Sequence, residues 1–453
     1  MKETMIIAAP AAPASGESLP WPTPTQVWGG VALFGGTVFF LFANNTIVGL
    51  MLVMIKKDFG LTDTGVSWIV GFAGVLFAAL AAVPVARLVD SKRRKVIIGV
   101  GWLIVGTGSL LCGLARGFWG LLLARLVGGV GGSGNGPAAY SILADYMPPE
   151  KLPRALAVMN IGFALSRPAA LIFGGGLIAL VSTMPEWNLP WIGTLHRWQL
   201  VFLCLGIPEF LLGVLALMML HEPRRRGAQT TEVVPLRDIW RHIYEHRRAF
   251  APMFFGLALN SLSFGSSQWA AAFFQRTYGW SPQQFGIIEG AILFVLAPVG
   301  MLAGGFIAER LAKKGYDDAN LRVVFYGVLL LQPFALAYPL MPTAPWAIVM
   351  SVMNTTIAGA LGAPQNAALQ VILPNRMRGI ITALYLLVFT LIGIGLGPTI
   401  VGLITDYVIG DESKVRYSLV LLQLLVGPLA VLVFYLGMKP YGDEYARMKS
   451  LQS

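Results

Sequence analysis

A few ionisable side chains stand inside long apolar stretches of this sequence, and they have the most chemistry to offer. Arg167 is about thirteen residues into the run that begins near Arg154, which in a helix places it ~20 Å from the start of the run. A guanidinium at that depth can hold a carboxylate or a phosphate through two parallel hydrogen bonds. The alternatives are a buried ion pair, or a cap on a carbonyl that Pro168 leaves without a donor. We expect Arg167 to contact an anionic ligand.

Glu289 is about seven residues into the run that begins near Pro282, or ~10 Å from the start of that run. A partly desolvated carboxylate can carry a proton, because its charged form is costly away from water. It could instead pair with Arg167 and form a gate, although the two estimated depths differ by ~10 Å. A solvated position near a helix end is the third reading, and the sequence leaves all three open.

Arg125 is a further arginine in an apolar run, and no acidic partner for it is evident in the pattern. It could bind an anion, or it could only donate hydrogen bonds to backbone carbonyls or to Asn44 and Asn45. Neutral polar side chains recur in these runs, where a wet cavity suits them better than lipid does. Hydrogen bonding between helices is the alternative for each of them. The candidates for lining a cavity are Asn44, Asn45, Asn135, Asn260, Gln268, Trp269, Asn354, Gln365 and Asn366.

The composition indicates which elements must position these groups. The 453 residues are 56% hydrophobic and 12% charged, whereas roughly 25% of residues in a typical soluble domain are charged. With Cys112 and Cys204 as its only cysteines, the chain is no disulfide scaffold. Apolar runs of about 20 residues recur, long enough to cross ~30 Å of hydrocarbon. They do not alternate as barrel strands do. We therefore predict an all-α integral membrane protein with twelve transmembrane helices.

The predicted helices fall into two sets of six around a polar, basic segment. Residues 1–26, rich in Ala and Pro, are expected to form a disordered cytoplasmic N-terminus. Residues 27–220 form a first six-helix bundle, 221–250 a cytoplasmic linker, 251–437 a second six-helix bundle, and 438–453 a cytoplasmic tail. No secretory signal pattern is present, so we expect nothing to be removed. The helices should start near Trp28, Thr64, Val96, Trp119, Arg154, Trp198, Ala251, Pro282, Arg322, Pro345, Arg378 and Tyr417.

The net charge of +11 follows from 33 Lys and Arg against 22 Asp and Glu. The basic residues form short clusters between apolar runs, a pattern that disfavours nucleic-acid binding. They gather in the loops after the second, fourth, eighth and tenth helices, and the intervening loops have fewer. Because cytoplasmic loops carry the excess of Lys and Arg, we expect a multi-pass protein of the plasma (inner) membrane with both termini cytoplasmic.

The two sets of six helices repeat each other. The second helix ends in a small residue, then Asp90, then a basic cluster that includes Arg94; the eighth ends in the same pattern at Glu309 and Arg310. These four residues lie at helix ends, so we expect them to latch one membrane face rather than to contact a ligand. Such repetition is typical of transporters built from related halves, with the substrate near the midplane between them.

The loop that contains Asp90 and Arg94 resembles the signature between helices 2 and 3 of the major facilitator superfamily, and residues 125–131 resemble its helix 4 signature. Longer stretches resemble the Spinster branch, known for lipid and lysolipid export. These stretches are residues 121–128, 137–149, 275–279, 374–379 and 391–398. The resemblance covers nearly the whole chain after residue 30. It implies the fold of that superfamily, with two pseudo-repeated six-helix halves.

This sequence departs from the Spinster pattern at two places that concern the coupling of transport to protons. Spinster-like proteins usually have an Asp-Arg pair midway along helix 1, and the matching positions here are Asn44 and Asn45. They usually have a glutamate in helix 4, and the matching position is Gly132. In that branch these residues form the protonation network. If this chain is coupled to protons, Glu289 is our candidate carrier.

We therefore predict a secondary transporter that works by alternating access and moves an amphipathic organic anion or a lysolipid-like molecule. Arg167 and Arg125 would bind the anionic head of that substrate. The alternative function is efflux of multiple drugs or aromatic compounds. A membrane enzyme or sensor is the least favoured, because no reactive cluster can be assembled from the spacing. We expect no cofactor, metal or nucleic acid. The expected partners are a small-molecule substrate and membrane lipid, and the expected state is a monomer.

Overall fold

The computed structural model describes residues 21–148, 150–190, 193–225, 236–374 and 377–450. Most of the N-terminal segment predicted to be disordered, residues 1–26, lies outside this set, as do the last residues of the predicted tail. The first helix begins at Pro24, because Thr23 and Gln26 cap it reciprocally. The Gln26 backbone N–H donates to Thr23 Oγ1, and the Thr23 N–H donates to the Gln26 side chain.

The first half of the molecule contains six helical crossings and one small hairpin, which the sequence did not predict. The hairpin is the antiparallel pair β1 (Trp187–Leu189) and β2 (Gly193–Leu195) between α8 and α9, with Trp187 opposite Leu195. The helices are α1 (Pro24–Leu50) and its short continuation α2 (Leu52–Phe59); α3 (Asp63–Ser67), the π-helical turn η1 (Trp68–Phe72) and α4 (Ala73–Ser91); α5 (Arg94–Gly113); α6 (Phe118–Gly132) with α7 (Asn135–Tyr146); α8 (Leu152–Ser182); and α9 (Arg197–Met219).

The second half repeats this plan after a short connecting helix, α10 (Leu236–Glu245). Its elements are α11 (Arg247–Ser266), η2 (Ser267–Trp269) and α12 (Ala270–Tyr278); α13 (Pro282–Lys313); α14 (Ala319–Ala337) with η3 (Tyr338–Leu340); α15 (Ala344–Val371); α16 (Arg378–Val388), η4 (Phe389–Leu396), α17 (Gly397–Leu403) and η5 (Ile404–Ile409); and η6 (Glu412–Lys414) with α18 (Val415–Ser450). Because α18 continues without a break to Ser450, the predicted tail from 438 is helical where it is described.

Eleven helices among the described residues are long and apolar enough to cross a membrane. The fourth predicted crossing is missing from that set because it is divided into α6 and α7 at Ser133 and Gly134. The division falls in a glycine-rich stretch, residues 128–136, where each glycine weakens a helix by about 1 kcal/mol relative to alanine. Together α6 and α7 form the fourth of the twelve predicted crossings. The predicted all-α class is confirmed.

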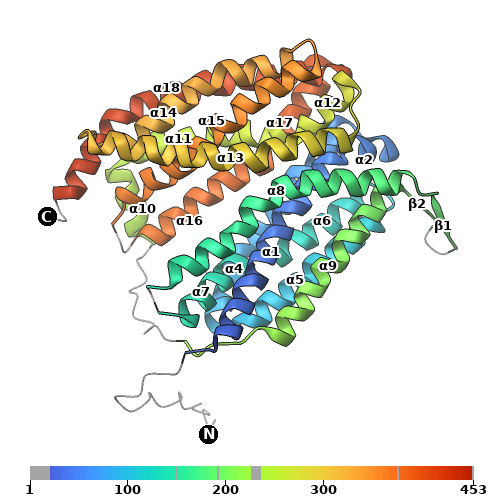
Figure 1. The fold of residues 1–453 in the computed structure, drawn as a ribbon, viewed down its shortest axis with the longest axis horizontal. Coiled ribbons are helices and arrows are strands. Elements are labelled where there is room, and N and C mark those ends of the chain that lie inside the picture. The colour runs from blue at the N-terminus through green and yellow to red at the C-terminus, as the bar shows by residue number, and fades with distance from the viewer. Residues whose placement is uncertain (1–20, 149, 191–192, 226–235, 375–376, 451–453) are drawn as a thin grey trace, which may run out of the picture.

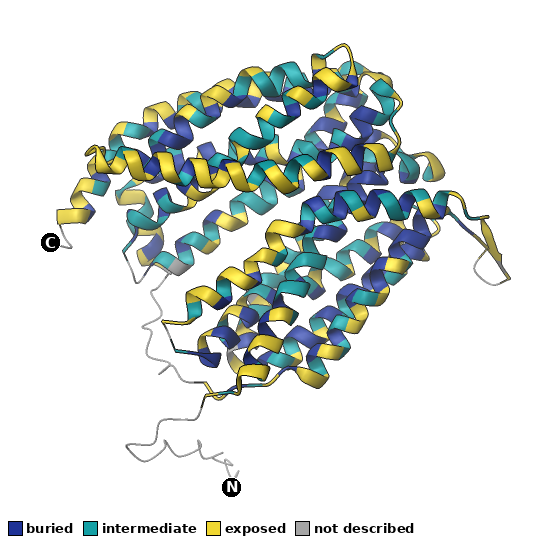
Figure 2. Ribbon diagram, in the orientation of Figure 1, coloured by how far each residue is buried: buried dark blue, intermediate teal, exposed yellow. Residues whose placement is uncertain are grey.

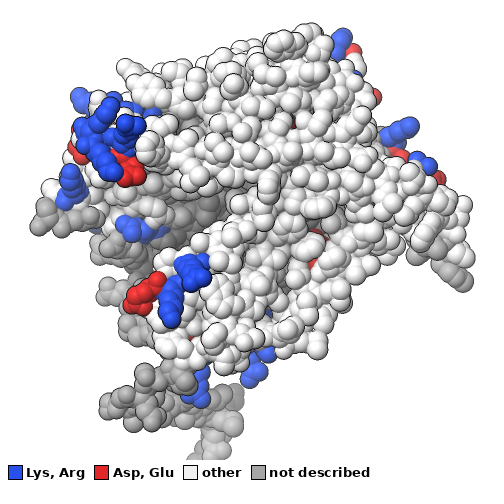
Figure 3. Space-filling view, in the orientation of Figure 1, with Lys and Arg blue, Asp and Glu red and all other residues white. Residues whose placement is uncertain are grey.

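The two halves lie side by side and meet mainly at one end (Figure 1). We call the end that carries Trp21 and Ser450 the terminal end, and the end with α2, α12 and the hairpin the far end. Contacts between the halves run from α8 to α13, from α3 to α17 and from η1 to η4. Toward the terminal end the halves diverge, and a space-filling view shows a hollow between them (Figure 3).

The surface matches a lipid environment. Exposed residues run along the outer faces of the long helices (Figure 2), and large apolar side chains such as Phe173, Met218 and Leu302 are among them. Charged side chains gather at the two ends of the molecule, with a broad uncharged belt between them (Figure 3). An apolar belt of this width is what hydrocarbon stabilises and water does not.

Close packing inside the first half leads to a stability prediction. A Cβ on Gly162 of α8 would lie 2.1 Å from the carbonyl oxygen of Gly35 on α1, whereas one on Gly176 of the same helix would meet nothing within 4 Å. Gly162→Ala should therefore destabilise the bundle by about 1–3 kcal/mol through overpacking, and Gly176→Ala should not. Thermal unfolding of the two purified variants measures this difference, and equal melting temperatures would contradict the packing described.

Candidate functional site

Arg167 lies at the midpoint of α8 and reaches across to the other half of the molecule. Its Nη2 donates a hydrogen bond to Ser267 Oγ at 2.9 Å, and its guanidinium carbon lies 5.3 Å from the centre of the Phe264 ring. Among the residues that the structure describes, this is the one hydrogen bond that the guanidinium makes. The side chain is half-buried. Its contacts with Phe264 and Ser267 turn it toward the other half rather than outward to lipid, and no carboxylate among the described residues forms an ion pair with it.

Arg167 lies beside a tight contact between α8 and α13. The carbonyl oxygen of Pro168 lies 2.9 Å from where a Cβ on Gly290 would stand, and a Cβ on Gly286 would lie 2.2 Å from the carbonyl oxygen of Leu171. Only glycine allows two backbones to approach so closely. Arg167 therefore stands next to a closely packed part of the interface between the halves.

Glu289 of α13 lies close to Arg167 without forming an ion pair. Its side chain is buried, and both of its carboxylate oxygens lie 2.9 Å from Ser351 Oγ of α15, which donates to it. Because Gly290 packs against Pro168, Glu289 and Arg167 stand at a similar level, and the difference of ~10 Å estimated from helix lengths is wrong. The approach of Gly290 to Pro168 brings the neighbouring Glu289 and Arg167 to the same part of the interface between α8 and α13. Within the described part of the chain, no ion pair of 4.0 Å or less joins them.

A second polar centre lies inside the first half, and it contains an acid that the sequence analysis missed. Glu209 of α9 is 0% exposed and accepts hydrogen bonds from Asn44 Nδ2, at 3.0 Å, and from Ser109 Oγ. The sequence alone could have identified Glu209, because it is a lone carboxylate in the apolar run of α9, next to Pro208. The criterion that identified Glu289 would have identified it too.

Arg125 completes this centre. Its Nη1 donates to Asn44 Oδ1 at 2.7 Å and its Nη2 to Asn45 Oδ1 at 2.8 Å. The sequence left open whether Arg125 binds an anion or donates hydrogen bonds to Asn44 and Asn45. In this structure it makes those two hydrogen bonds. We call the set of Glu209, Ser109, Asn44, Asn45 and Arg125 the buried carboxylate network.

A cluster of charges joins the two halves at the far end. Asp63 at the start of α3 is 0% exposed and receives Arg276 of α12 in a two-pronged pair, with Nη1 to Oδ2 at 2.6 Å and Nη2 to Oδ1 at 2.8 Å. Lys56 Nζ lies 2.6 Å from Asp63 Oδ1 and also pairs with Glu412 of the other half. The carboxylate of Asp406 accepts the backbone N–H of Asp63 at 3.1 Å.

We call these five residues, Lys56, Asp63, Arg276, Asp406 and Glu412, the far-end latch. Two come from the first half and three from the second, so the far end stays closed while their contacts hold. Asp406 adds a contact to the first turn of α3, since it also accepts the Thr64 N–H at 2.7 Å. An acid placed there satisfies backbone donors that a helix start leaves without partners.

The neutral candidates divide into buried packing residues and residues nearer the surface. The structure contradicts the prediction that Trp269 lines a cavity. Its side chain is 0% exposed, and its indole N–H donates to the carbonyl of Pro398, so it belongs to the core. Asn135 is buried between Trp102 and Thr37, which is hydrogen bonding between helices. Gln365 is buried, Gln268 packs beside Gly49, and Asn260, Asn354 and Asn366 are partly or fully exposed.

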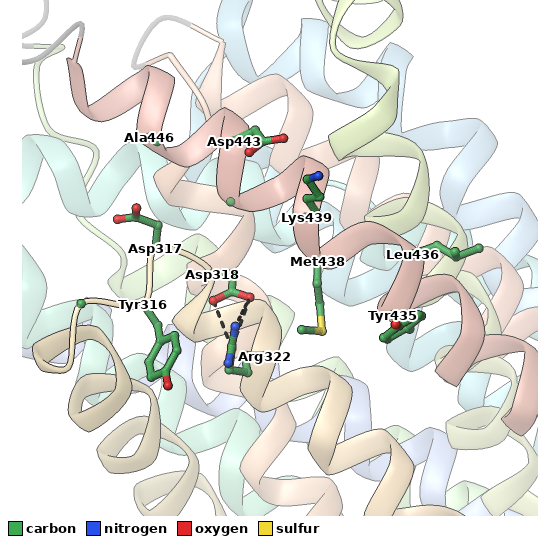
Figure 4. Close-up of a pocket in the computed structure, with 12 residues that line it drawn as sticks. Tyr316, Asp317, Asp318, Arg322, Tyr435, Leu436, Met438, Lys439, Asp443 and Ala446 are labelled. Carbon is green, nitrogen blue, oxygen red and sulfur yellow. Dashed lines mark hydrogen bonds and ion pairs between the residues drawn. The ribbon is translucent and has the colours of Figure 1, made fainter.

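An open pocket of about 650 Å³ lies at the terminal end of the second half, away from Arg167. It is formed by the loop after α13 and by the last turns of α18. Figure 4 shows its charged residues of both signs, including the ion pair of Asp318 with Arg322 at 3.0 Å, and Lys439 and Asp443. This mixture of charges does not favour an anion, so the pocket is not our candidate site.

Comparison with known proteins decides the family. The model of the Major Facilitator Superfamily matches residues 33–398, which is most of the chain. The chain belongs to the major facilitator superfamily. The protein is therefore a transporter rather than an enzyme, as the sequence predicted.

An MFS-type efflux pump of Mycolicibacterium smegmatis is 24% identical over 403 residues, covering 89% of this chain and 90% of that one. A probable L-galactonate transporter of Escherichia coli is 20% identical over 422 residues, covering 89% and 87%.

Solved structures show the same superfamily fold. A bacterial homolog of the human lysosomal transporter Spinster, solved in an inward-facing, unoccupied conformation, has a TM-score of 0.77 at 21% identity and covers 95% of this chain and 99% of its own. The nucleoside transporter NupG has a TM-score of 0.69 at 13% identity and covers 92% and 99%. The similarity to the Spinster homolog agrees with the motifs noted in the sequence.

The loop motif of the superfamily is arranged differently from our expectation of a latch across the terminal end. Arg94 is buried inside its own half, where it pairs with Asp145 and, at 3.0 Å, with Glu222. Glu309 pairs at 2.6 Å with Lys313 of its own helix and is 61% exposed there. The predicted latch does not form in this structure because the halves stand apart at this end.

Of the other two members of the predicted latch, only Arg310 has a described side chain. The guanidinium of Arg310 lies 5.6 Å from the Phe306 ring of its own helix. The side chain of Asp90 lies outside the described part of the structure.

Proposed function

We propose that this transporter moves an amphipathic organic anion or a lysolipid-like molecule by alternating access. The observation that carries the proposal is the place of Arg167, a half-buried cation between the halves. Its guanidinium makes one hydrogen bond to the described residues, to Ser267. A guanidinium has five N–H donors, so donors remain for a carboxylate or phosphate. The Phe264 ring beside it offers an apolar surface for the remainder of an amphipathic molecule.

Orientation and conformation form part of the same proposal. With the terminal end on the cytoplasmic side of the plasma membrane, the hollow between the halves opens inward and the far-end latch closes the outer side. The basic loops at the terminal end support this orientation. The Spinster homolog of similar fold was solved in inward-facing conformations. A single chain contains both halves, so we propose a monomer.

Glu289 is the acidic member of the proposed site. Its carboxylate is buried on α13 beside Ser351 and lies near Arg167. An anion bound at Arg167 would approach this carboxylate, and repulsion between the two would favour a protonated Glu289. Glu289 is therefore our candidate proton carrier at the interface between the halves.

Efflux of multiple drugs or aromatic compounds is the second candidate function. The efflux pump of M. smegmatis favours it as a relative similar over most of both chains. A buried carboxylate such as Glu289 could also attract a lipophilic cation. Arg167 would repel such a cation at the same level of the interface, and this places efflux of cations second.

A thermal-shift screen on the purified transporter separates the two functions. Organic acids and anionic lysolipids should raise the melting temperature, because a ligand at 100 times its Kd stabilises the folded state by about 2.7 kcal/mol. Lipophilic cations of similar size should leave it unchanged. Stabilisation by the cations with none by the anions would reverse the assignment in favour of efflux.

A further inference from the structure

The buried carboxylate network contains an ionisable group that the proposed site between the halves does not use. Glu209 is 0% exposed and forms no ion pair with any described residue. Its nearest cation is reached through an intervening amide: Asn44 Nδ2 donates to Glu209 at 3.0 Å, and Asn44 Oδ1 accepts from Arg125 at 2.7 Å. A carboxylate held this deep in a membrane helix is costly and calls for a role.

The hydrogen bonds define the orientation of the Asn44 amide. A guanidinium has donors only, so the amide atom that faces Arg125 is the oxygen, and the amide nitrogen must face Glu209. That nitrogen donates to Glu209 and, at 3.0 Å, to Ser109 Oγ, and the Ser109 hydroxyl in turn donates to Glu209. Both carboxylate oxygens therefore accept, and this arrangement suits an ionised Glu209.

Protonation of Glu209 would reverse this arrangement. A proton taken from water forms an O–H bond on the carboxyl group, and this new donor needs an acceptor. Rotation of the Asn44 amide presents its oxygen to Glu209 and its NH₂ group to Arg125. Two donors would then face each other, and Arg125 would lose that acceptor. Its guanidinium would become available for another anion.

We propose that Glu209 is a proton-linked positioning residue, which acts through Asn44 to control whether Arg125 can hold an anion. The inference rests on the proposed function, in which the substrate is an organic anion. It adds that each anion bound at Arg125 is accompanied by a proton bound at Glu209. The negative charge of the bound anion is then balanced by the positive charge of the proton. The protein carries the anion and the proton without burying an extra net charge.

Other titratable groups face Glu209 and have to be distinguished from it. Among the described residues these are Arg125 of α6 and the Cys112 thiol of α5, which interact electrostatically with it and with each other. Asn44 of α1 and Ser109 of α5 are neutral. Cys112 is buried and has no disulfide partner. A variant that lacks the thiol therefore belongs in the test.

The experiment measures the binding of octanesulfonate to the purified full-length protein by calorimetry. A sulfonate keeps its charge from mildly acidic to mildly alkaline pH, so any pH dependence comes from the protein. In the wild-type protein we expect the affinity to rise by up to about tenfold for each unit by which the pH falls. Buffers of different ionisation enthalpy should report one proton taken up per sulfonate.

Glu209→Gln should bind octanesulfonate at all pH values with the acid-pH affinity of the wild type, and without proton uptake. Cys112→Ala, which removes the other titratable group beside Glu209, should keep the pH dependence. Asn44→Ala removes the link between Glu209 and Arg125 and should also abolish the pH dependence. Melting temperatures check that each variant is folded, and the Asn44 variant serves if Glu209→Gln does not fold.

The proposal is overturned if Glu209→Gln retains the proton uptake of the wild type, or if Cys112→Ala loses it. Binding to the wild type without proton uptake at any pH also overturns it, but leaves the proposed anion transport intact. Failure of the wild type to bind the sulfonate at every pH contradicts the proposed function itself. The two failures are thereby distinguished.

Discussion

Replacing Arg167 with alanine is expected to abolish the transport of organic anions while leaving the folded bundle in place. The substitution removes the cation that reaches from α8 to the other half, together with its hydrogen bond to Ser267. The cation would pair with the anionic head of the bound substrate, and losing one partner of such a charge pair costs about 2–5 kcal/mol when the pair is enclosed. This cost corresponds to a fall in affinity of roughly 30-fold to more than 1,000-fold. Uptake of a labelled anionic lysolipid into proteoliposomes, at matched protein content, measures the loss.

Two further variants control this result. Arg167→Lys keeps the charge but loses the planar fork that holds a carboxylate or phosphate, so we expect weak residual transport. Arg322→Ala removes an arginine of the terminal-end pocket that is paired with Asp318 of its own helix end, and transport should stay near the wild-type level. Unchanged uptake in Arg167→Ala, or an equal loss in Arg322→Ala, would contradict the role given to Arg167.

Replacing Asp63 with asparagine should shift the transporter toward a conformation that is open at the far end. The substitution leaves Arg276 and Lys56 without the buried carboxylate that holds them. Breaking a buried ion pair costs about 3–5 kcal/mol, and ~5.5 kcal/mol is enough to convert a 1:99 population into 99:1. We therefore expect a large change in the population of the two states.

Distances between spin labels on Thr183 and Lys414 measure this shift. Thr183 follows α8 just before the hairpin of the first half, and Lys414 lies in η6 of the second half, beside Glu412 of the far-end latch. The distance should lengthen in Asp63→Asn. In Glu309→Gln, which breaks an exposed pair within one helix, it should not change. An unaltered distance distribution in Asp63→Asn would show that the far-end latch does not hold the halves together.

Most of the fold could be predicted from the sequence because lipid leaves the backbone few choices. A helix satisfies its own hydrogen bonds, so each long apolar run becomes one; α13 begins at Pro282 and α16 at Arg378, where the sequence placed them. The break between α6 and α7 was not predicted. It depends on how several glycines pack, and periodicity does not report that.

The candidate site was only partly predictable. Arg167 and Glu289 could be found because a charge in an apolar run is costly and easily recognised, but their shared level depends on the close approach of Gly290 to Pro168. The far-end latch could not be found, since Asp63 and Arg276 are 213 positions apart and charges at helix ends are usually solvated. Trp269 was misassigned because its polar sequence neighbours did not reveal a buried indole.

The most direct test is a crystal structure of the transporter with an amphipathic sulfonate that carries a bromine atom on its tail. We expect the sulfonate between α8 and α11, with its oxygens about 3 Å from the guanidinium nitrogens of Arg167. The anomalous signal of the bromine should lie in the hollow between the halves. A sulfonate bound elsewhere, with Arg167 enclosed by packing and out of its reach, would contradict the account.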